Sequence, residues 1–158
     1  MTMKIDKIDR RILKELQKDS GRSMSDVADA VGLSQSPCWR RIDRMQREGI
    51  IEKQVSLLST KALGFNAHLF VQVKLNAHGR QHLDEFSAAM EDLDEVLECW
   101  VLMGTADFML RVVTRDMESY ERLFFDKLSK VPGVQEINST MALSRIKSTT
   151  ALPLDVLR

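Results

Sequence analysis

Apolar residues recur with the period of an α-helix three times within the first fifty residues. The first apolar stripe consists of Ile5, Ile8, Ile12 and Leu16. The second consists of Met24, Val27, Ala28 and Val31. The third consists of Cys38, Trp39, Ile42 and Met45. Spacings of three and four residues place each set on one side of a helix, so the pattern predicts three short amphipathic helices.

The residues between these stripes carry start and stop signals for helices. Asp6 and Asp9 suit the first turn of the first helix, and Ser23 suits the N-cap of the second. Gly32 ends the second helix before a tight turn, and Gly49 ends the third. Three helices with a glycine-containing turn between the last two are typical of a helix-turn-helix. A plain three-helix bundle is the alternative.

The third helix separates its apolar and basic residues onto opposite sides. On a helical wheel with Trp39 at zero, its other apolar residues fall between about 240° and 300°, beside Trp39. The arginines of this helix fall between about 80° and 200°. We therefore interpret Trp39 and Ile42 as the anchors of the helix in the core, with the guanidinium groups directed outward.

Outward-facing arginines on such a helix are suited to nucleic acid. The planar guanidinium group binds two acceptors at once, on a phosphate or on the edge of guanine. Small polar residues at the helix N-terminus suit the end that enters the major groove. The predicted DNA-binding residues are Ser34, Gln35, Ser36, Arg40, Arg41, Arg44 and Arg47. The alternative is a solvated face in which Asp43 pairs with Arg40 or Arg47.

The rest of the chain predicts a second domain with strands and helices in alternation. The β-branched segment at residues 50–59 is expected to be a strand that leaves the first domain, which gives boundaries of 1–60 and 61–158. The elements expected after it are a strand at 68–75, a helix at 79–93, strands at 96–103 and 108–114, a helix at 117–131 and a strand at 135–147. This order predicts an α+β, ferredoxin-like βαββαβ domain with both helices on one face of an antiparallel sheet.

The other face of that sheet needs a cover. The strand segments at 70–73, 100–103 and 108–110 carry apolar or large residues on both sides, and no further helix is predicted. A second copy of the sheet is the expected cover, which gives a two-fold homodimer. Two helix-turn-helix units related by symmetry read a palindromic operator with half-sites about 34 Å apart, or a multiple of that.

The charge, apolar content and cysteine content of the chain indicate the compartment in which the protein works. Residues 1–56 contain 12 Lys and Arg against 9 Asp and Glu, whereas the remainder contains 11 against 14. The chain therefore has a basic half and an acidic half. No apolar run approaches the ~20 residues of a membrane span. Two cysteines, Cys38 and Cys99, make neither a disulfide framework nor a zinc motif. We expect a cytoplasmic protein without contact to a membrane.

At this point the chain resembles the Lrp/AsnC (leucine-responsive, or feast/famine) transcriptional regulators almost from end to end. The shared segments are "IDKIDRRILKELQKD" at 5–19, "VGLSQSPCWRRIDRMQREGII" at 31–51, the G-x-x-D turn of "MGTADFMLRV" at 103–112, "LSKVPGVQEINS" at 128–139 and "KSTTALPL" at 147–154. The resemblance implies an N-terminal helix-turn-helix and a C-terminal ligand-sensing domain of the RAM or ACT-like kind. It also implies dimers that assemble into octamers or similar rings, and an amino acid or related metabolite as effector.

The resemblance also indicates where an effector would bind, near the turn between the second and third strands at an interface between dimers. The effector-binding residues implied in this way are Gly104, Thr105, Ala106, Asp107, Asn138 and Thr140. A glycine turn exposes backbone N–H groups that suit a carboxylate, and Asp107 suits an α-ammonium group. Many relatives carry an aromatic residue at the position of Ala106. The alternative is a simple hairpin turn.

The sequence thus predicts a DNA-binding transcriptional regulator that responds to an amino acid or related small metabolite. An architectural DNA-binding protein without a specific ligand is the first alternative, and an amino-acid-handling enzyme is the second. No cluster of catalytic residues, phosphate-binding loop or metal motif stands out, so we expect no enzymatic activity, no cofactor and no metal.

Overall fold

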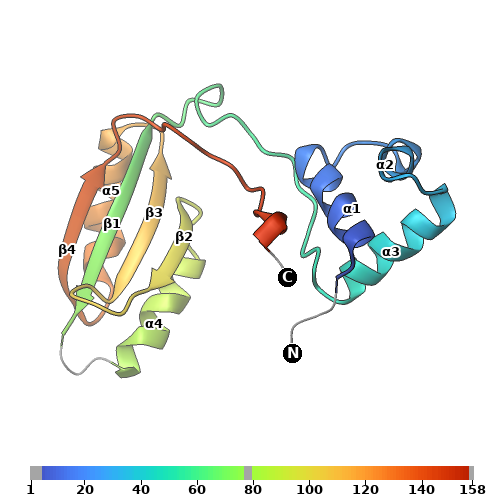
Figure 1. Cartoon of the computed structure of the whole chain (residues 1–158). Helices are drawn as coiled ribbons and strands as arrows, with labels where there is room; N and C mark the ends of the chain where they lie inside the picture. Colours follow the sequence, from blue (N-terminus) through green and yellow to red (C-terminus); the bar gives the residue numbers. More distant parts are fainter. Residues whose placement is uncertain (1–4, 77–79, 157–158) are drawn as a thin grey trace. The chain divides into compact units, whose positions relative to one another are not determined.

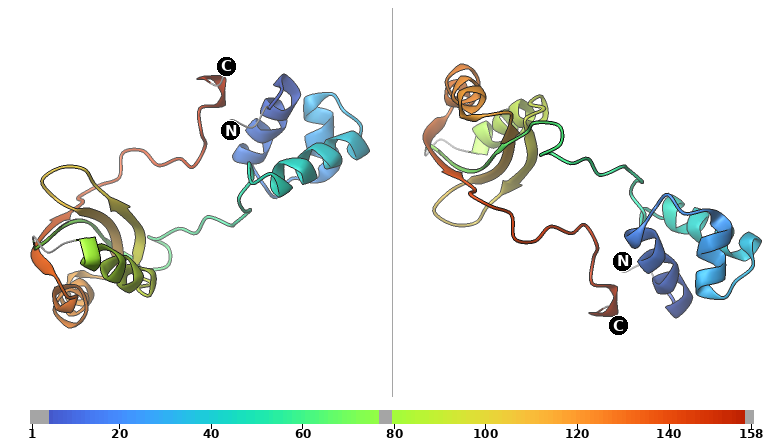
Figure 2. Two further views of the ribbon diagram at one scale, coloured as in Figure 1. Left: turned by 90° about the horizontal axis from the view of Figure 1, so that it is seen from below. Right: turned by 90° about the horizontal axis from the view of Figure 1, so that it is seen from above.

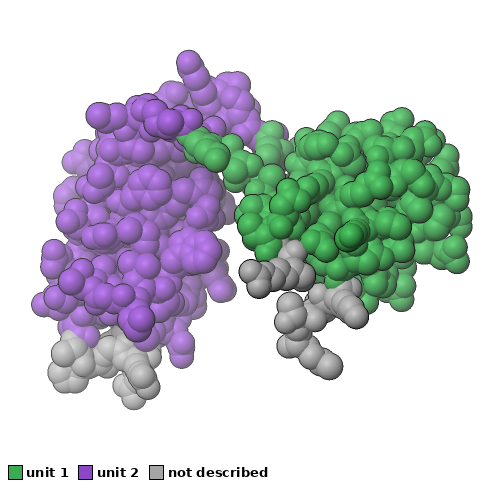
Figure 3. Space-filling model, in the orientation of Figure 1, with its two compact units in different colours: residues 1–57, 147–158 green, residues 58–146 purple. Residues whose placement is uncertain are grey.

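The computed structural model describes residues 5–76 and 80–156, and the chain forms two compact units. Unit 1 comprises Met1–Leu57 together with Lys147–Arg158, and unit 2 comprises Leu58–Ile146 (Figure 3). The first boundary falls close to the expected residue 60. The second differs from the expectation of a domain running from 61 to 158, because the C-terminal segment packs in unit 1.

Three helices form the body of unit 1 (Figure 1). They are α1 at Lys7–Lys18, α2 at Met24–Val31 and α3 at Gln35–Arg47. The N-terminus of α1 is a capping box, in which Asp6 and Asp9 each accept a hydrogen bond from the backbone N–H of the other. Gly32 ends α2 in the left-handed region at φ 70°, where a side chain would be strained. The three predicted helices and their end signals are confirmed.

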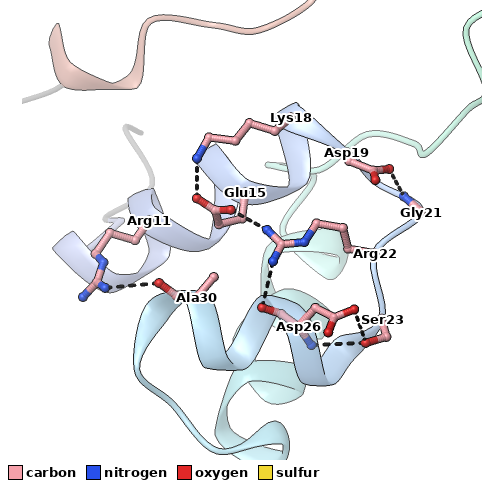
Figure 4. A network of polar contacts seen from close by, with 9 residues as sticks. All are labelled: Arg11, Glu15, Lys18, Asp19, Gly21, Arg22, Ser23, Asp26 and Ala30. Atoms are coloured by element: carbon pink, nitrogen blue, oxygen red, sulfur yellow. Dashed lines mark hydrogen bonds and ion pairs between the residues drawn. The ribbon is translucent and has the colours of Figure 1, made fainter.

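A polar network fixes α2 against α1 and so sets the position of the turn that leads into α3 (Figure 4). The guanidinium group of Arg22 lies between the helices, where it pairs with the Glu15 carboxylate of α1 and donates to the Asp26 carbonyl of α2. Arg11 of α1 donates to the carbonyl of Ala30, near the end of α2. Because these bonds tie the two helices at both ends of α2, the orientation of the following turn is defined.

The C-terminal segment completes the core of unit 1. A short 3₁₀ helix, η2 at Leu154–Val156, places Leu154 among the apolar side chains of the three helices, with 7% of its surface exposed. Gln17 of α1 exchanges two hydrogen bonds with the backbone of Leu152, and Lys14 pairs with Asp155. Burial of this leucine side chain explains why the described C-terminal residues, 147–156, belong with the helices rather than with the sheet.

Unit 2 is a four-stranded antiparallel sheet with two helices on one face (Figures 1 and 2). The strands are β1 at Ala67–Leu75, β2 at Val96–Val101, β3 at Phe108–Thr114 and β4 at Val134–Met141. Their order in the sheet is β2-β3-β1-β4, and the helices are α4 at Arg80–Glu91 and α5 at Met117–Asp126, with a 3₁₀ turn η1 at Leu128–Lys130. This is the ferredoxin-like βαββαβ arrangement that the sequence predicts.

Strict alternation along β1 separates the two faces of the sheet. Leu69, Val71 and Val73 are buried against the helices, whereas Phe70 and Gln72 between them are exposed on the other face. The buried core of unit 2 is formed by these residues with others from the strands and helices, among them Phe86, Met90, Phe108, Leu110, Val112, Tyr120 and Leu123. The face opposite the helices has no cover within the described part of the chain.

The expected exit strand at residues 50–59 is not a strand in the single chain. The segment from Glu52 to Ser59 is irregular, and the side chains of Val55, Leu57 and Leu58 are exposed. Its β-branched and apolar composition favours strand geometry, but a strand forms only where a neighbouring strand supplies the hydrogen bonds. Among the residues described, no strand pairs with this segment.

Candidate functional site

Helix α3 is held in unit 1 by one narrow apolar edge. Cys38, Ile42 and Met45 are buried there, as the wheel predicts. The expectation that Trp39 is a second anchor is wrong, because 55% of its surface is exposed. Trp39 lies about 60° from Ile42 on the wheel, at the border of the apolar side, and it is not among the residues that pack against the core of unit 1.

The outward side of α3 is therefore a mixed stripe rather than a purely basic one. Its exposed residues at helical spacing are Ser36, Trp39, Arg40 and Arg47, with Asp43 partly buried among them. Asp43 pairs with Arg47 at 2.8 Å, four residues along the helix, as the solvated-face alternative proposed. Such exposed pairs contribute little stability and exchange readily for other ionic partners. The charge of Arg47 therefore stays available to a polyanion.

Arg41 and Arg44 have a different role from the other two arginines, because both are bound to aspartates of α1. The carboxylate of Asp9 is 1% exposed and accepts from Arg41 at 2.8 Å and from Arg44 at 2.6 Å. Arg41 also donates to Asp6 at 2.7 Å. This Asp6–Asp9–Arg41–Arg44 cluster joins the N-terminus of α1 to the middle of α3 and fixes how α3 is rotated about its axis.

The charges of this cluster stabilise one another. The backbone N–H of Asp9, and after it the Arg41 guanidinium group, hold the pKa of Asp6 below its ordinary value of 3.8. Hydrogen bonds from Arg41 to Asp6 and then to Asp9 raise the pKa of that guanidinium group. Both groups are therefore charged over the whole physiological pH range.

The space beside the cluster is an open depression of about 440 Å³, lined by Asp6, Pro37, Arg40, Arg41 and Arg44. Arg40 lies at its outer wall with an exposed side chain. The N-terminal residues Ser34, Gln35 and Ser36 are also exposed. Ser34 occupies the N-cap position, but its side chain makes no capping hydrogen bond. Hydroxyl, amide and guanidinium groups thus gather at the N-terminal half of α3.

The loop between β2 and β3 contains the predicted effector residues Gly104 to Asp107. Asp107 has a structural role in unit 2: its carboxylate accepts from the backbone N–H of Leu75 at 2.7 Å, and its own N–H donates to Val73. Its carbonyl accepts from Leu102 at 2.8 Å, which closes the loop. Asp107 thus fastens the loop to the end of β1. Gly104 and Thr105 are exposed, whereas Ala106 is partly buried.

Asn138 and Thr140 lie apart from this loop within one chain. The strand register places Asn138 opposite Gln72 and Thr140 opposite Phe70, on the face of the sheet that lacks helices. β4 is two strands away from β3, which is a lateral separation of about 10 Å. Thr140 is displaced further, toward the opposite end of the sheet from the loop. Within one copy, the loop and these two polar residues of β4 are therefore not on adjacent strands.

Other kinds of site are absent from the part of the chain that the structure describes. Residues 5–76 and 80–156 contain no group of three or more His, Cys, Asp or Glu side chains arranged to hold a metal ion. Over the same residues, no helix combines the length and the apolar content needed to cross a bilayer.

Comparisons with known proteins match both units. Residues 5–52 match a model described as winged helix-turn-helix DNA-binding, and residues 68–152 match one described as Lrp/AsnC ligand binding domain. The DNA-binding transcriptional activator DecR of Escherichia coli is 34% identical over 151 residues, covering 96% of this chain and 99% of DecR. The leucine-responsive regulatory protein of Salmonella typhimurium is 34% identical over 148 residues, covering 94% and 90%.

Two solved structures share the whole fold. An AsnC family transcriptional regulator from Agrobacterium tumefaciens is similar with a TM-score of 0.92 and 36% identity, covering 98% of this chain and all of that one. A transcriptional regulator from Neisseria meningitidis, solved as a complex with L-Met, has a TM-score of 0.92 and 32% identity, covering 96% and 98%.

A helix-turn-helix with an exposed basic helix, followed by a ferredoxin-like sensing domain, defines a DNA-binding transcriptional regulator. The chain belongs to the Lrp/AsnC family, which confirms the resemblance of its motifs. Its relatives regulate transcription and are not enzymes, so the enzyme alternative is set aside.

Proposed function

We propose that two copies of this chain bind a palindromic operator through the outward stripe of α3 and that an amino acid or related metabolite controls that binding. The observation that carries the proposal is that the four arginines of α3 fall into two pairs with different contacts. Arg41 and Arg44 are bound to Asp9, so they orient α3, whereas the side chains of Arg40 and Arg47 extend outward from it. A helix fixed in rotation presents the same side chains to every operator.

Each residue of the proposed interface has a chemical task. Arg40 donates to a phosphate or to a guanine edge in the major groove, and Arg47 contributes phosphate contact near the end of the helix. The N-terminus of α3, where the helix dipole favours phosphate, contacts the DNA backbone and base edges through Ser34, Gln35 and Ser36. Arg41 and Arg44, whose charges are balanced by Asp6 and Asp9, position the wall of the depression beside Arg40.

The uncovered face of the sheet supports a homodimer. One row across it consists of Trp100, Met109, Gln72 and Asn138, and the next consists of Glu98, Arg111, Phe70 and Thr140. Trp100 in the first row is 61% exposed and Phe70 in the second is 46% exposed, each beside polar side chains. A partner sheet buries both aromatic groups, and the exposed apolar segment at residues 55–58 gains a strand partner in the same assembly.

The effector proposal concerns contacts between dimers, which assemble into an octamer or similar ring. The segment leading into the β2–β3 loop exposes Val101, Leu102 and Met103, an apolar surface that suits such a contact. The backbone at Gly104 and the hydroxyl of Thr105 bind the carboxylate of an amino acid there. Asn138 and Thr140 of another copy complete the site, since within one chain β4 is not adjacent to β3. The effector acts by binding one assembly more tightly than another. We place this regulation in the cytoplasm, where the operator and the metabolite are both present.

Selection of duplexes from a random-sequence pool tests the DNA-binding proposal. We expect the full-length protein to enrich a palindrome, with an affinity that falls steeply as salt increases because phosphate contacts release counterions. Binding that depends on salt but enriches no sequence would favour the architectural alternative. Failure to retain duplex DNA at low salt would refute the proposal altogether.

Gly104→Ala offers a clean test of the effector proposal. Beyond its two chain neighbours, a Cβ at this position meets no atom of the described residues within 4 Å, and the backbone of Gly104 is not left-handed, so the variant should fold with unchanged stability. A thermal-shift screen of the twenty amino acids should find at least one that stabilises the wild type. We expect the same amino acid to stabilise Gly104→Ala less, because the added methyl group occupies the ligand's space. An equal shift in both proteins would exclude this loop.

A further inference from the structure

We propose that Trp39 is a specificity-determining residue of the regulator, whose indole contacts the C5-methyl group of a thymine in the major groove. The proposal rests on DNA binding by α3, as set out above, and assigns one base contact to one side chain. It concerns a residue whose hydrophobic character alone would place it in the core.

The position of Trp39 on α3 is that of a groove-facing residue. It is the fifth residue of the helix, within the N-terminal half, between Ser36 one turn before it and Asp43 one turn after it. Arg40 follows directly on the same outward side. The apolar edge of the helix is already complete without the indole, because Cys38, Ile42 and Met45 fill it.

The exposure of the indole calls for an explanation. A tryptophan is on average among the more buried residues, and leaving its apolar surface in water is unfavourable. More than half of Trp39 is nonetheless exposed. Among the residues described, its ring N–H donates to no acceptor and its ring contacts no other aromatic ring. An apolar surface that makes no stabilising contact within its own unit is stabilised when a binding partner covers it.

The chemistry of the side chain points to a base rather than to the phosphate backbone. The indole carries no charge, so it neutralises no phosphate. In the major groove, thymine alone presents an apolar group, its C5-methyl, beside the hydrogen-bonding edges. A flat apolar side chain flanked by Ser36 and Arg40 contacts that methyl group while its neighbours hold the sugar-phosphate backbone and adjacent base edges.

Replacing thymine by deoxyuracil tests the contact from the DNA side, since it removes only the methyl group. We would take the duplex selected by the wild-type protein and replace each thymine in turn. We expect the wild type to lose affinity about fourfold at one position in each half-site, which corresponds to the burial of one methyl group. Trp39→Ala should bind the unmodified duplex about tenfold more weakly and show no further loss at that position.

Three further variants separate this contact from other effects. Trp39→Phe keeps an aromatic face and should retain the sensitivity to deoxyuracil. Gln46→Ala changes an exposed residue near the other end of the same helix and should behave as the wild type. Trp39→Ala should leave the slope of log affinity against log salt unchanged, whereas Arg40→Ala should lower its magnitude by about one.

The outcomes distinguish this inference from the proposed function. If the wild type binds no duplex, the proposed function fails and the inference fails with it. If the wild type selects a palindrome but Trp39→Ala gives the same deoxyuracil profile, only the inference is overturned. It is overturned equally if Trp39→Ala changes the mass of the assembly in solution and not the profile, which would assign Trp39 to a protein contact.

Discussion

Asp9→Asn is expected to lower the free energy of unfolding of unit 1 by about 3 kcal/mol, although it replaces only one carboxylate oxygen by an NH₂ group. The Asp9 carboxylate accepts from Arg41, from Arg44 and from the backbone N–H of Asp6 while almost fully buried. The asparagine leaves Arg44 without its anion and leaves Arg41 with Asp6 alone. The loss falls at the lower end of the range for broken buried pairs because Arg41 and Arg44 are only partly buried.

The measurement is a pair of thermal and urea unfolding curves, with Asp43→Asn as the matched control. Within the described part of the chain, Asp43 pairs with Arg47 alone, at the surface, so its replacement should cost less than about 0.5 kcal/mol. Asp9→Asn should lower the melting temperature by more than about 10 °C and weaken DNA binding as well, because α3 loses its fixed rotation. If the two variants prove equally stable, the cluster does not hold α3.

Phe70→Asp is expected to convert the proposed dimer to monomer and to weaken operator binding by at least about a hundredfold, because each half-site is then bound separately. Phe70 lies at the centre of the uncovered face, and the register places it opposite Arg111 on β3. In the isolated unit a carboxylate there is exposed to solvent and close to Arg111, which also pairs with Glu98, so the fold should persist. Between two sheets the same carboxylate is buried without enough partners.

Sedimentation and circular dichroism measure the two parts of this prediction. Phe125→Asp is the control, since Phe125 is exposed to a similar degree on α5, on the helical side of unit 2. That variant should remain associated and should bind DNA as the wild type. A Phe70→Asp protein that keeps the mass of the wild type would show that copies do not meet through this face.

Local signals in the sequence were sufficient to predict the elements of this fold. The capping residues Asp6, Asp9 and Ser23 act on backbone groups within three residues of themselves, so their helices could be assigned without tertiary information. The strict alternation along β1 likewise reflects which face a side chain occupies.

What the sequence could not supply depends on groups distant along the chain. Arg41 meets Asp9 across 32 residues, so nothing near α3 distinguished it from Arg40. Leu154 enters the helical core from the far end of the chain. Trp39 was assigned to the core from its hydrophobicity and wheel angle, but burial also requires a neighbouring element to cover it. The segment at 50–59 likewise has a composition that favours a strand, but a strand also requires a neighbouring strand to pair with.

Protection of individual arginines from chemical modification would test most directly whether the outward side of α3 is the surface that binds DNA. The rates of modification by phenylglyoxal would be followed residue by residue by mass spectrometry, with and without saturating duplex. We expect duplex DNA to slow the reaction of Arg40 and Arg47 strongly, while Arg122, exposed on α5, reacts at the same rate in both samples. If Arg40 and Arg47 reacted as fast with saturating duplex as without it, α3 would not be the DNA-binding surface.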